Sequence, residues 1–357
     1  MRPARMLLAC TLSAAACAAT APAPAATATV RPELRTTSPS GPVTIVAAGD
    51  TILGDTPVLP AHPATYLRGV TTYVRNADIS FGNLEGTLTT ATAGKCSAGS
   101  SACFDFRNPP RYAGYLRDAG FDIMGMANNH SHDFGQVGLD QTVRSLNNHG
   151  LRHTGLPGQI TVLQANGTRV AFVAFAPYPW ASNLLKVDAA MALIRKAVSK
   201  ADLVVVYMHA GGEGSDRQHV TGREEYFLGE DRGNPERFGH RAVKNGADLV
   251  IASGPHVLRG MEFYRHRLIA YSLGNFCGYK NFNTAGVLAR SAVLRVRLGS
   301  RGGFRRGRIV SLHLSSVNRP ARDTTNAAAS MIRNLSHEDF DARAVRVLAR
   351  GRIEPKS

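Results

Sequence analysis

Short apolar segments of this chain repeatedly run into polar residues and then into an amphipathic stretch. Residues 43–48 end at Gly49-Asp50, residues 121–126 end at a cluster of Asn, His and Asp side chains, and residues 202–208 end at His209. Strands that alternate with helices form largely parallel sheets, whose carboxyl ends share one edge and commonly bind ligands. The sequence therefore predicts an α/β fold with a polar site at one edge of a sheet.

Further elements extend this alternation. Helices are expected at 62–76, 136–148, 187–200 and 235–245, and one more begins after a capping Asn108, with Pro109 and Pro110 in its first turn. Strands are expected at 78–81, 169–176 and 248–252, the second following an Asn166-Gly167 turn. Residues 257–264 and 267–272 predict a hairpin, and 287–298 and 308–316 alternate as half-buried antiparallel strands do.

The ends of the chain differ in composition from its middle. Arg2 and Arg5 precede an apolar run and then small residues, which is the order of a secretory signal peptide. Lipid attachment at Cys17 is a weaker alternative, because Ala14 stands where Leu is expected. We expect a signal peptide at 1–28, a Pro/Thr/Ser-rich linker at 29–42, a domain at 43–317, and an Arg- and Ala-rich helical tail at 318–357. Ser336 is a plausible cap in this tail, which is expected to pack loosely or not at all.

Charge and cysteine usage suggest where such a chain works. The formal net charge is +16, which favours contact with acidic polymers, a cell wall or an anionic membrane surface. A composition set by GC-rich coding is an equally weighted alternative. No zinc finger, helix-turn-helix or aromatic-basic RNA motif is visible, so nucleic acid is not an expected partner.

Cys96 and Cys103 bracket a short polar loop and are expected to form a disulfide in an oxidising compartment, the alternative being two surface thiols. Cys277 is left over and is expected to be buried. Together with the signal peptide, this favours a secreted or cell-surface protein.

Carboxylate, amide and imidazole groups recur at the predicted strand ends. Taken singly, Asp50 could be a turn residue, Asn129 an Asx turn and His209 a hydrogen-bonded core histidine. Together, such groups at one sheet edge are the ligand set of a divalent-metal hydrolase. The set comprises Asp50, Asn83, Glu85, Asn129, His130, Asp133, His209, Glu213 and His256.

The order of these motifs resembles the CapA family, the poly-γ-glutamate capsule biosynthesis proteins. The resemblance covers roughly residues 43 to 277. It is carried by Gly49-Asp50, Asn83-Leu84-Glu85, Asn128-Asn129-His130-x-x-Asp133-x-Gly135, His209, Gly254-Pro255-His256-Val257 and Tyr271-Ser272-Leu273-Gly274-Asn275-Phe276. It implies a calcineurin-like metallophosphoesterase-type αββα sandwich, in which two mixed β-sheets are flanked by helices and metals lie at the strand ends.

The same resemblance implies roles for individual residues. Asp50 and His256 would bind a first metal, Asn129 and His209 a second, and Glu85 would bridge the two. The metal would be one or two divalent ions, Mn, Zn or Fe. His130 would assist the leaving group and Asp133 would orient it. Asn83, Glu213 and Asn275 are expected to contact substrate, although Glu213 could instead be an exposed loop acid. Arg217, His219, Arg223 and Arg232 lie in a segment, 213–234, that is a candidate lid.

Two departures from the metallophosphoesterase pattern are visible. Ile52 stands where a His usually follows the first Asp, and Ser253-Gly254-Pro255 precedes a single His256 instead of a paired-His motif. Each implied metal therefore lacks one ligand.

The favoured hypothesis is an exported metal-dependent hydrolase or transferase that uses a metal-activated water on a phosphoester or γ-glutamyl amide of an acidic polymer. The alternative is a non-catalytic binding or assembly component of a polymer-synthesis or export complex, working with capsule-synthesis membrane proteins. A weaker hypothesis is a broad phosphodiesterase acting on nucleotides or phospholipids.

Overall fold

Two mixed β-sheets face each other in the computed structural model, which describes residues 41–97 and 103–355. The first sheet has the spatial order β20 (Val345–Val347), β21 (Arg352–Pro355), β18 (Phe304–Leu314), β17 (Arg290–Leu298), β1 (Val43–Thr51), β2 (Ile79–Leu84), β5 (Ile123–Gly125) and β6 (Arg152–Thr154). Two short strands pair at its flanks, β16 (Asn275–Cys277) with β1 and β19 (Pro320–Arg322) with β18. Strands β1, β2, β5 and β6 are parallel, and β17 and β18 run antiparallel.

The second sheet has the order β14 (Met261–Tyr264), β15 (Arg267–Ala270), β13 (Leu249–Ser253), β10 (Leu203–His209), β8 (Thr168–Ala176) and β7 (Thr161–Ala165), with β9 (Ser182–Asn183) beside β8. Its central strands β8, β10, β13 and β15 are parallel. Two small ribbons lie outside both sheets, β3 (Thr87–Leu88) with β4 (Arg107–Asn108) and β11 (Tyr226–Phe227) with β12 (Glu230–Asp231).

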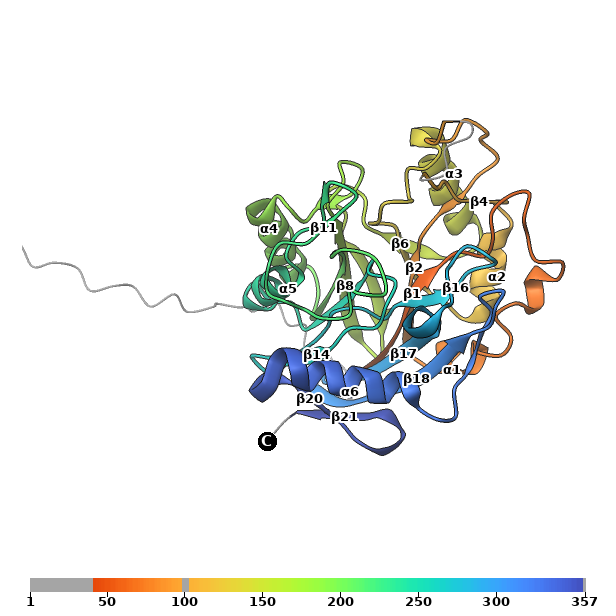
Figure 1. Cartoon of the computed structure of the whole chain (residues 1–357). Helices are drawn as coiled ribbons and strands as arrows, with labels where there is room; N and C mark the ends of the chain where they lie inside the picture. Colours follow the sequence, from red (N-terminus) through yellow and green to blue (C-terminus); the bar gives the residue numbers. More distant parts are fainter. Residues whose placement is uncertain (1–40, 98–102, 356–357) are drawn as a thin grey trace, which may run out of the picture. The chain divides into compact units, whose positions relative to one another are not determined.

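Helices cover part of the outer face of each sheet, as Figure 1 shows. The helices α1 (Thr71–Arg75), α2 (Tyr112–Ala119) and α3 (Gly135–Asn148) pack on the first sheet, while α4 (Val187–Val198) and α5 (Pro235–Lys244) pack on the second. A buried core between the sheets contains Ile45, Phe81, Phe172 and Tyr207. The predicted αββα sandwich with two mixed sheets is confirmed. Among the described residues no helix is long and apolar enough to cross a membrane.

Alternation of apolar and polar residues explains why the sheets form where they do. On β1, Ile45 and Ala47 face the other sheet, whereas Val46 and Ala48 face the helices, so the strand is apolar on both sides. Such continuous apolar runs are typical of strands covered on both faces. The predicted hairpin turn at Asn166-Gly167 is also confirmed, because both residues have the positive φ that a tight turn between β7 and β8 requires.

The C-terminal segment differs from the prediction of a loosely packed helical tail at 318–357. One helix, α6 (Ala327–Phe340), is present, but β19, β20 and β21 extend the first sheet, and Ala328, Ala329 and Ile332 are buried in the core between the sheets. Ser336 does not cap a helix: it is buried within α6 and accepts a hydrogen bond from the backbone N–H of Met261. The apolar residues of this segment are sufficient to anchor it, despite its many arginines.

Two predicted helix starts are also wrong. The segment 62–76 forms a 3₁₀ turn, η1 (Pro63–Thr65), and then the short α1, with turns between them. Asn108 belongs to β4 and donates its side-chain N–H to the Gly54 carbonyl, so it does not cap α2. The predicted signal peptide and nearly all of the linker at 29–42 lie outside the described residues.

Candidate metal centre

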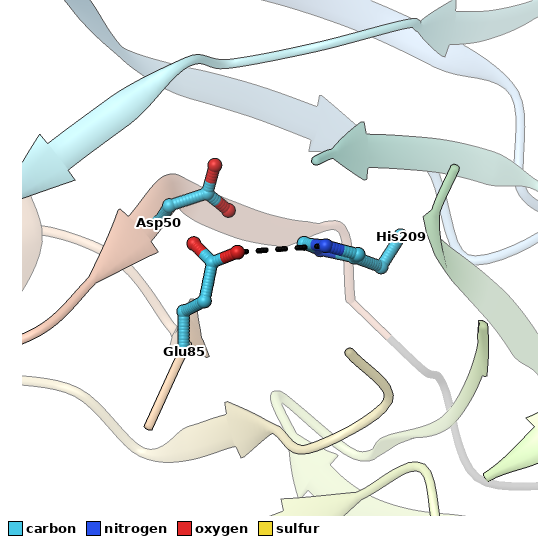
Figure 2. A group of neighbouring side chains, drawn as sticks. All are labelled: Asp50, Glu85 and His209. Atoms are coloured by element: carbon cyan, nitrogen blue, oxygen red, sulfur yellow. Dashed lines mark ion pairs between the residues drawn. The ribbon is translucent and has the colours of Figure 1, made fainter. Parts of the chain in front are cut away.

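The carboxyl ends of β1, β2 and β10 bring three predicted ligands together. Asp50 lies near the end of β1, Glu85 directly follows β2, and His209 ends β10. Their ligand atoms all lie within 4.8 Å of one another, and all three side chains are fully buried. Figure 2 shows the two carboxylates and the imidazole pointing toward one another, with Glu85 Oε1 3.5 Å from His209 Nε2.

His256, which follows β13, joins this cluster. Its Nδ1 is 3.2 Å from Asp50 Oδ2, and its Nε2 is 3.7 Å from Glu85 Oε1 and 3.6 Å from Glu213 Oε2. The backbone of His256 has a φ of 60°, in the left-handed region that a non-glycine residue seldom adopts. Such strain is commonly found where a site dictates the direction of a side chain.

Asn129 is the predicted ligand that forms no hydrogen bond or ion pair with the other four. It lies in the turn after β5, where its Oδ1 is buried and has no hydrogen-bond partner among the described residues. Ile52, at the position of the missing histidine, is buried and apolar, so it offers no ligand atom.

Asp50 is held by the strands on both sides of it. Its backbone N–H donates to the Gly274 carbonyl at 3.0 Å, and a Cβ at Gly49 would lie only 1.9 Å from the same oxygen, so the close approach requires glycine. Asn83 donates its amide to Asp50 Oδ1 at 2.8 Å, and Ser253 donates its hydroxyl to that oxygen as well. These contacts leave Oδ2 directed at the cluster.

Asn83 is itself fixed from beneath, because its Oδ1 accepts a hydrogen bond from Asn128 at 2.9 Å. It is fully buried, so the structure places it behind Asp50, whereas the sequence predicted a substrate contact. On the other sheet, the Tyr207 hydroxyl lies 2.5 Å from the Ser253 hydroxyl and 3.3 Å from His209 Nδ1. The roles of Tyr207 and Ser253 were missed by the sequence analysis, since an apolar strand with a Tyr and a Ser has no distinctive signal.

The electrostatics of the cluster favour a bound cation. Burial raises the pKa of Glu85 well above its usual value, and the nearby charge of Asp50 raises it further. Burial alone would also raise the pKa of Asp50, but the contact with His256 and the charge of its imidazole outweigh this and lower the pKa. The pKa of His209 falls to about 3 because burial disfavours its charged form, so this imidazole is neutral and free to act as a ligand.

The donor set fits a divalent metal. Both oxygens of Glu85, Asp50 Oδ2 and His209 Nε2 are buried without a hydrogen-bond partner among the described residues. Leaving several buried polar atoms unpaired in one place costs a few kcal/mol each, and a cation would satisfy them together. Carboxylate oxygens combined with imidazole nitrogen suit Mn, Zn or Fe. The residues present therefore fit such an ion.

A cavity of about 260 Å³ opens beside the cluster and contains His130. His130 Nδ1 lies 2.9 Å from Asp133 Oδ2, the contact expected of a carboxylate that orients an imidazole. Asp133 also accepts the backbone N–H of Phe106 at 2.8 Å and forms an ion pair with Lys95 at 2.7 Å.

Lys95 adjoins the Cys96–Cys103 disulfide, which is present as predicted. Cys277 is buried and unpaired, also as predicted.

The remaining walls of this cavity are mostly aromatic and amide side chains. Its lining consists of Phe104, Phe106, His130, Glu213, Gly214, Phe227, His256, Asn275, Asn281, Phe282, Asn283 and Leu288. Two of the predicted substrate residues, Glu213 and Asn275, are therefore at the cavity. Asn275 accepts a hydrogen bond from His256 Nδ1 at 2.8 Å. Glu213 is largely buried and paired with Arg232 at 2.9 Å, so it is not the exposed loop acid of the alternative interpretation.

The candidate lid is partly engaged elsewhere. His219 pairs with Asp339 of α6 at 2.7 Å, on a different contact surface from the cavity. Arg232 stays near the cavity, where it pairs with both Glu213 and Glu230. Trp180, which the sequence analysis did not single out, donates its indole N–H to the Asn128 carbonyl and stacks on His132.

A second carboxylate and imidazole group lies between α5 and β14 and was not predicted. Glu236, His240 and Glu262 have ligand atoms within 4.8 Å of one another. Arg343 contacts both carboxylates at 2.8 Å, and the Tyr271 hydroxyl donates to Glu262. Because an arginine already neutralises these acids, this group is an ion-pair network that ties the C-terminal segment to the second sheet.

A known protein family matches this chain over most of its length. The family model described as bacterial capsule synthesis protein PGA_cap matches residues 44–280. The chain belongs to this family. The match begins within β1 and ends just beyond β16, so it includes every side chain of the candidate metal centre.

Curated relatives of this chain carry names from capsule synthesis. Capsule biosynthesis protein CapA of Bacillus anthracis is 30% identical over 183 residues, which cover 45% of this chain and 41% of that protein. PGA biosynthesis protein CapA of Bacillus subtilis is 29% identical over 179 residues, which cover 45% of this chain and 43% of that protein. The chain thus matches less than half the length of either relative.

Among solved structures, a 5'-nucleotidase precursor from Thermus thermophilus aligns with a TM-score of 0.41 and 13% identity, over 83% of this chain and 59% of that one. At this identity and TM-score the likeness extends no further than the general fold.

Proposed function

We propose that this PGA_cap family member is a divalent-metal hydrolase or transferase that acts on an acidic capsule or cell-wall polymer such as poly-γ-glutamate. The observation that carries the proposal is the buried Asp50, Glu85 and His209 cluster, whose ligand atoms lack hydrogen-bond partners, beside a cavity that contains His130. The names of the two Bacillus relatives support the polymer context.

Each residue has a distinct part in this proposal. A divalent ion held by Asp50, Glu85 and His209 would lower the pKa of a water molecule and polarise a phosphoryl or γ-glutamyl carbonyl group. His130 uses Nδ1 to bond Asp133, so its Nε2 remains available to protonate the leaving group. Asp133 fixes the tautomer and orientation of that imidazole, and its own position is fixed by the Phe106 N–H.

We further propose that the protein is exported and works at the cell surface beside capsule-synthesis membrane proteins. The basic, apolar and small-residue order of residues 1–28 supports export. The Cys96–Cys103 disulfide supports it independently, because such bonds persist in oxidising compartments.

Metal analysis of matched variants tests the proposal. The wild-type chain is expected to bind one or two equivalents of Mn, Zn or Fe, and Glu85→Gln to lose at least tenfold in metal affinity. His130→Gln is expected to keep the metal but to lose about 10²-fold or more in cleavage of γ-glutamyl oligomers or a nitrophenyl phosphodiester. His240→Gln, in the arginine-neutralised group, is the control and should retain metal and activity.

Two results would contradict this proposal. Full activity in both Glu85→Gln and His130→Gln would show that the cluster does not catalyse the reaction. A wild-type chain without stoichiometric metal that still binds polymer would support the non-catalytic assembly component instead.

A further inference from the structure

Arginines lie opposite one another on three neighbouring strands of the first sheet, β17, β18 and β21. In the antiparallel pairing of β17 and β18, Arg295 lies opposite Arg308 and Arg297 lies opposite Arg306. Arg308 in turn lies opposite Arg352 of β21. Like charges directly opposite each other in a sheet are destabilising, so this arrangement works against the stability of the strands that carry it.

These side chains lie on the outer face of the sheet. Their strand neighbours Leu294, Val296 and Ile309 are buried in the core between the two sheets. Because side chains alternate along a strand, the arginines point to the opposite side. Helix α6 packs on the apolar side of the same strands, through residues that belong to the core between the sheets.

The arginine face consists of two adjoining hollows. One has a volume of about 540 Å³ and is bordered on one side by Thr72, Tyr73 and Asn76 of the α1 region. The other has a volume of about 360 Å³. Arg295 and Arg308 line both hollows, so the two hollows adjoin at these side chains. The arginine face is defined by Arg295, Arg297, Arg306, Arg308, Arg322, Arg350 and Arg352.

Little negative charge balances this face. Among residues 41–97 and 103–355, Arg295, Arg297, Arg306 and Arg308 form no salt bridge with any carboxylate. Of the nearby carboxylates, Asp78 accepts the Thr44 N–H at 2.7 Å, Asp323 accepts the Ala327 N–H at 2.9 Å, and Glu354 pairs with Arg352 at 3.2 Å. Burial and the surrounding arginines lower the pKa of Arg295 despite Asp78, which reflects the concentration of positive charge.

We propose that the arginine face binds a linear polycarboxylate, a chain of the poly-γ-glutamate type, at a site separate from the metal centre. Guanidinium groups form forked hydrogen bonds with carboxylates. Strand geometry spaces them about 5 Å apart between strands and about 7 Å apart along a strand. A two-dimensional grid of this kind matches a polymer that presents a carboxylate at every residue, more than it matches a single anion. The choice of carboxylate rests on the proposed function, whereas the binding of an anionic chain does not.

The shape of the face favours such a chain over a membrane surface. The large apolar side chains that are most exposed are Val58, Phe104, Val137, Val162, Leu185, Tyr226, Leu228 and Val317. None of them lines either hollow, so the face offers no exposed side chain of this kind for insertion into a bilayer. The hollows are recessed, which suits a narrow chain that lies along the strands.

A set of charge-matched variants tests this inference. The face variant carries Arg295→Gln, Arg297→Gln, Arg306→Gln and Arg308→Gln, which remove cross-strand repulsion and should leave the thermal midpoint unchanged or higher. The control variant loses the same charge at exposed arginines outside the face, through Arg68→Gln, Arg144→Gln, Arg265→Gln and Arg333→Gln. Binding of fluorescent poly-γ-glutamate is measured by anisotropy at low and physiological salt.

We expect the face variant to bind the polymer at least tenfold more weakly than the wild type, with a smaller loss of affinity on adding salt. The control should stay within about twofold of the wild type. A variant with Lys at the same four positions keeps the charge but cannot form forked hydrogen bonds with carboxylates, and it should bind the polymer with intermediate affinity. Equal binding by the face and control variants would overturn the inference, because net charge alone would then explain it.

Binding of other anionic ligands is measured in the same way. Tighter binding to polyphosphate, duplex DNA or anionic phospholipid vesicles than to poly-γ-glutamate would overturn the assignment to a polycarboxylate. Free glutamate that displaces the polymer fully at equal carboxylate concentration would also overturn the inference, because the arginine face would then bind single anions and not a chain. The face variant should keep its metal content and its cleavage of a small chromogenic substrate, and Glu85→Gln should keep polymer binding. Failure of the proposed function and failure of this inference are therefore distinguishable.

Discussion

The buried ion pair between Arg259 and Glu225 leads to a prediction about stability. Arg259 is fully buried, and Glu225 is only 8% exposed. The two form a bidentate pair, with distances of 2.8 Å and 2.6 Å. Arg259 also donates to the Arg217 carbonyl, and Glu225 accepts the Gly212 N–H. The pair thus fixes the backbone on both sides of Glu213, a residue that lines the cavity.

The substitution Glu225→Gln keeps the size of the side chain and removes its charge. Breaking a buried pair by removing one partner costs about 3–5 kcal/mol, because the other charge stays buried without compensation. Since the Gln oxygen can still accept one hydrogen bond, we expect the lower end of this range, about 3 kcal/mol. This is a large share of the roughly 5–15 kcal/mol that stabilises an ordinary domain.

The assay is urea unfolding followed by the fluorescence of Trp180, the single tryptophan of the chain. Glu224→Gln is the matched control, because the neighbouring Glu224 pairs with Arg237 at the surface and its loss should cost less than about 1 kcal/mol. The double variant Glu225→Met with Arg259→Met should be more stable than Glu225→Gln, since no unpaired charge remains. Equal effects of Glu225→Gln and Glu224→Gln on the free energy of unfolding would contradict this prediction, as would a double variant that is no more stable than Glu225→Gln.

Two further predictions concern the backbone around the site. Replacing Cys96 and Cys103 with Ser opens an eight-residue loop and should lower the free energy of unfolding by about 2.5 kcal/mol. An unchanged urea midpoint would contradict this prediction and show that other contacts already constrain the loop. Gly49→Ala should strongly reduce soluble expression and metal binding, because the new Cβ would collide with the Gly274 carbonyl. Gly303→Ala is the control, because a Cβ at Gly303 meets nothing within 4 Å. Equal yields of the two variants would contradict the prediction.

The positions of the main ligands could be predicted from the sequence because they depend on strand ends alone. Asp50, Glu85 and His209 each close an apolar run, and parallel strands place such ends at a common edge. Asn129 also ends a strand region, but whether its side chain reaches the cluster depends on the conformation of a turn. Strand patterns carry no information about that conformation.

What the sequence analysis missed depends on contacts between distant segments. Asn83 supports Asp50 because Asn128, 45 residues later, holds its amide. Asn108 has the residue type of a helix cap, yet the pairing of β4 with β3 places it in a ribbon. The C-terminal strands did show alternation in Val345-Arg346-Val347, but the many arginines around them resembled a solvated tail. Tertiary pairing decided each of these cases against local propensity.

The distribution of cations explains why catalysis and polymer affinity would be separable in this chain. No Lys or Arg lines the described cavity beside the metal centre. Two cations that contact residues of the site are already paired, Lys95 with Asp133 and Arg232 with Glu213. On the arginine face, by contrast, four guanidinium groups have no carboxylate partner among the described residues. An acidic chain would therefore gain most of its affinity at the arginine face, while the cavity would accept only the group that reacts.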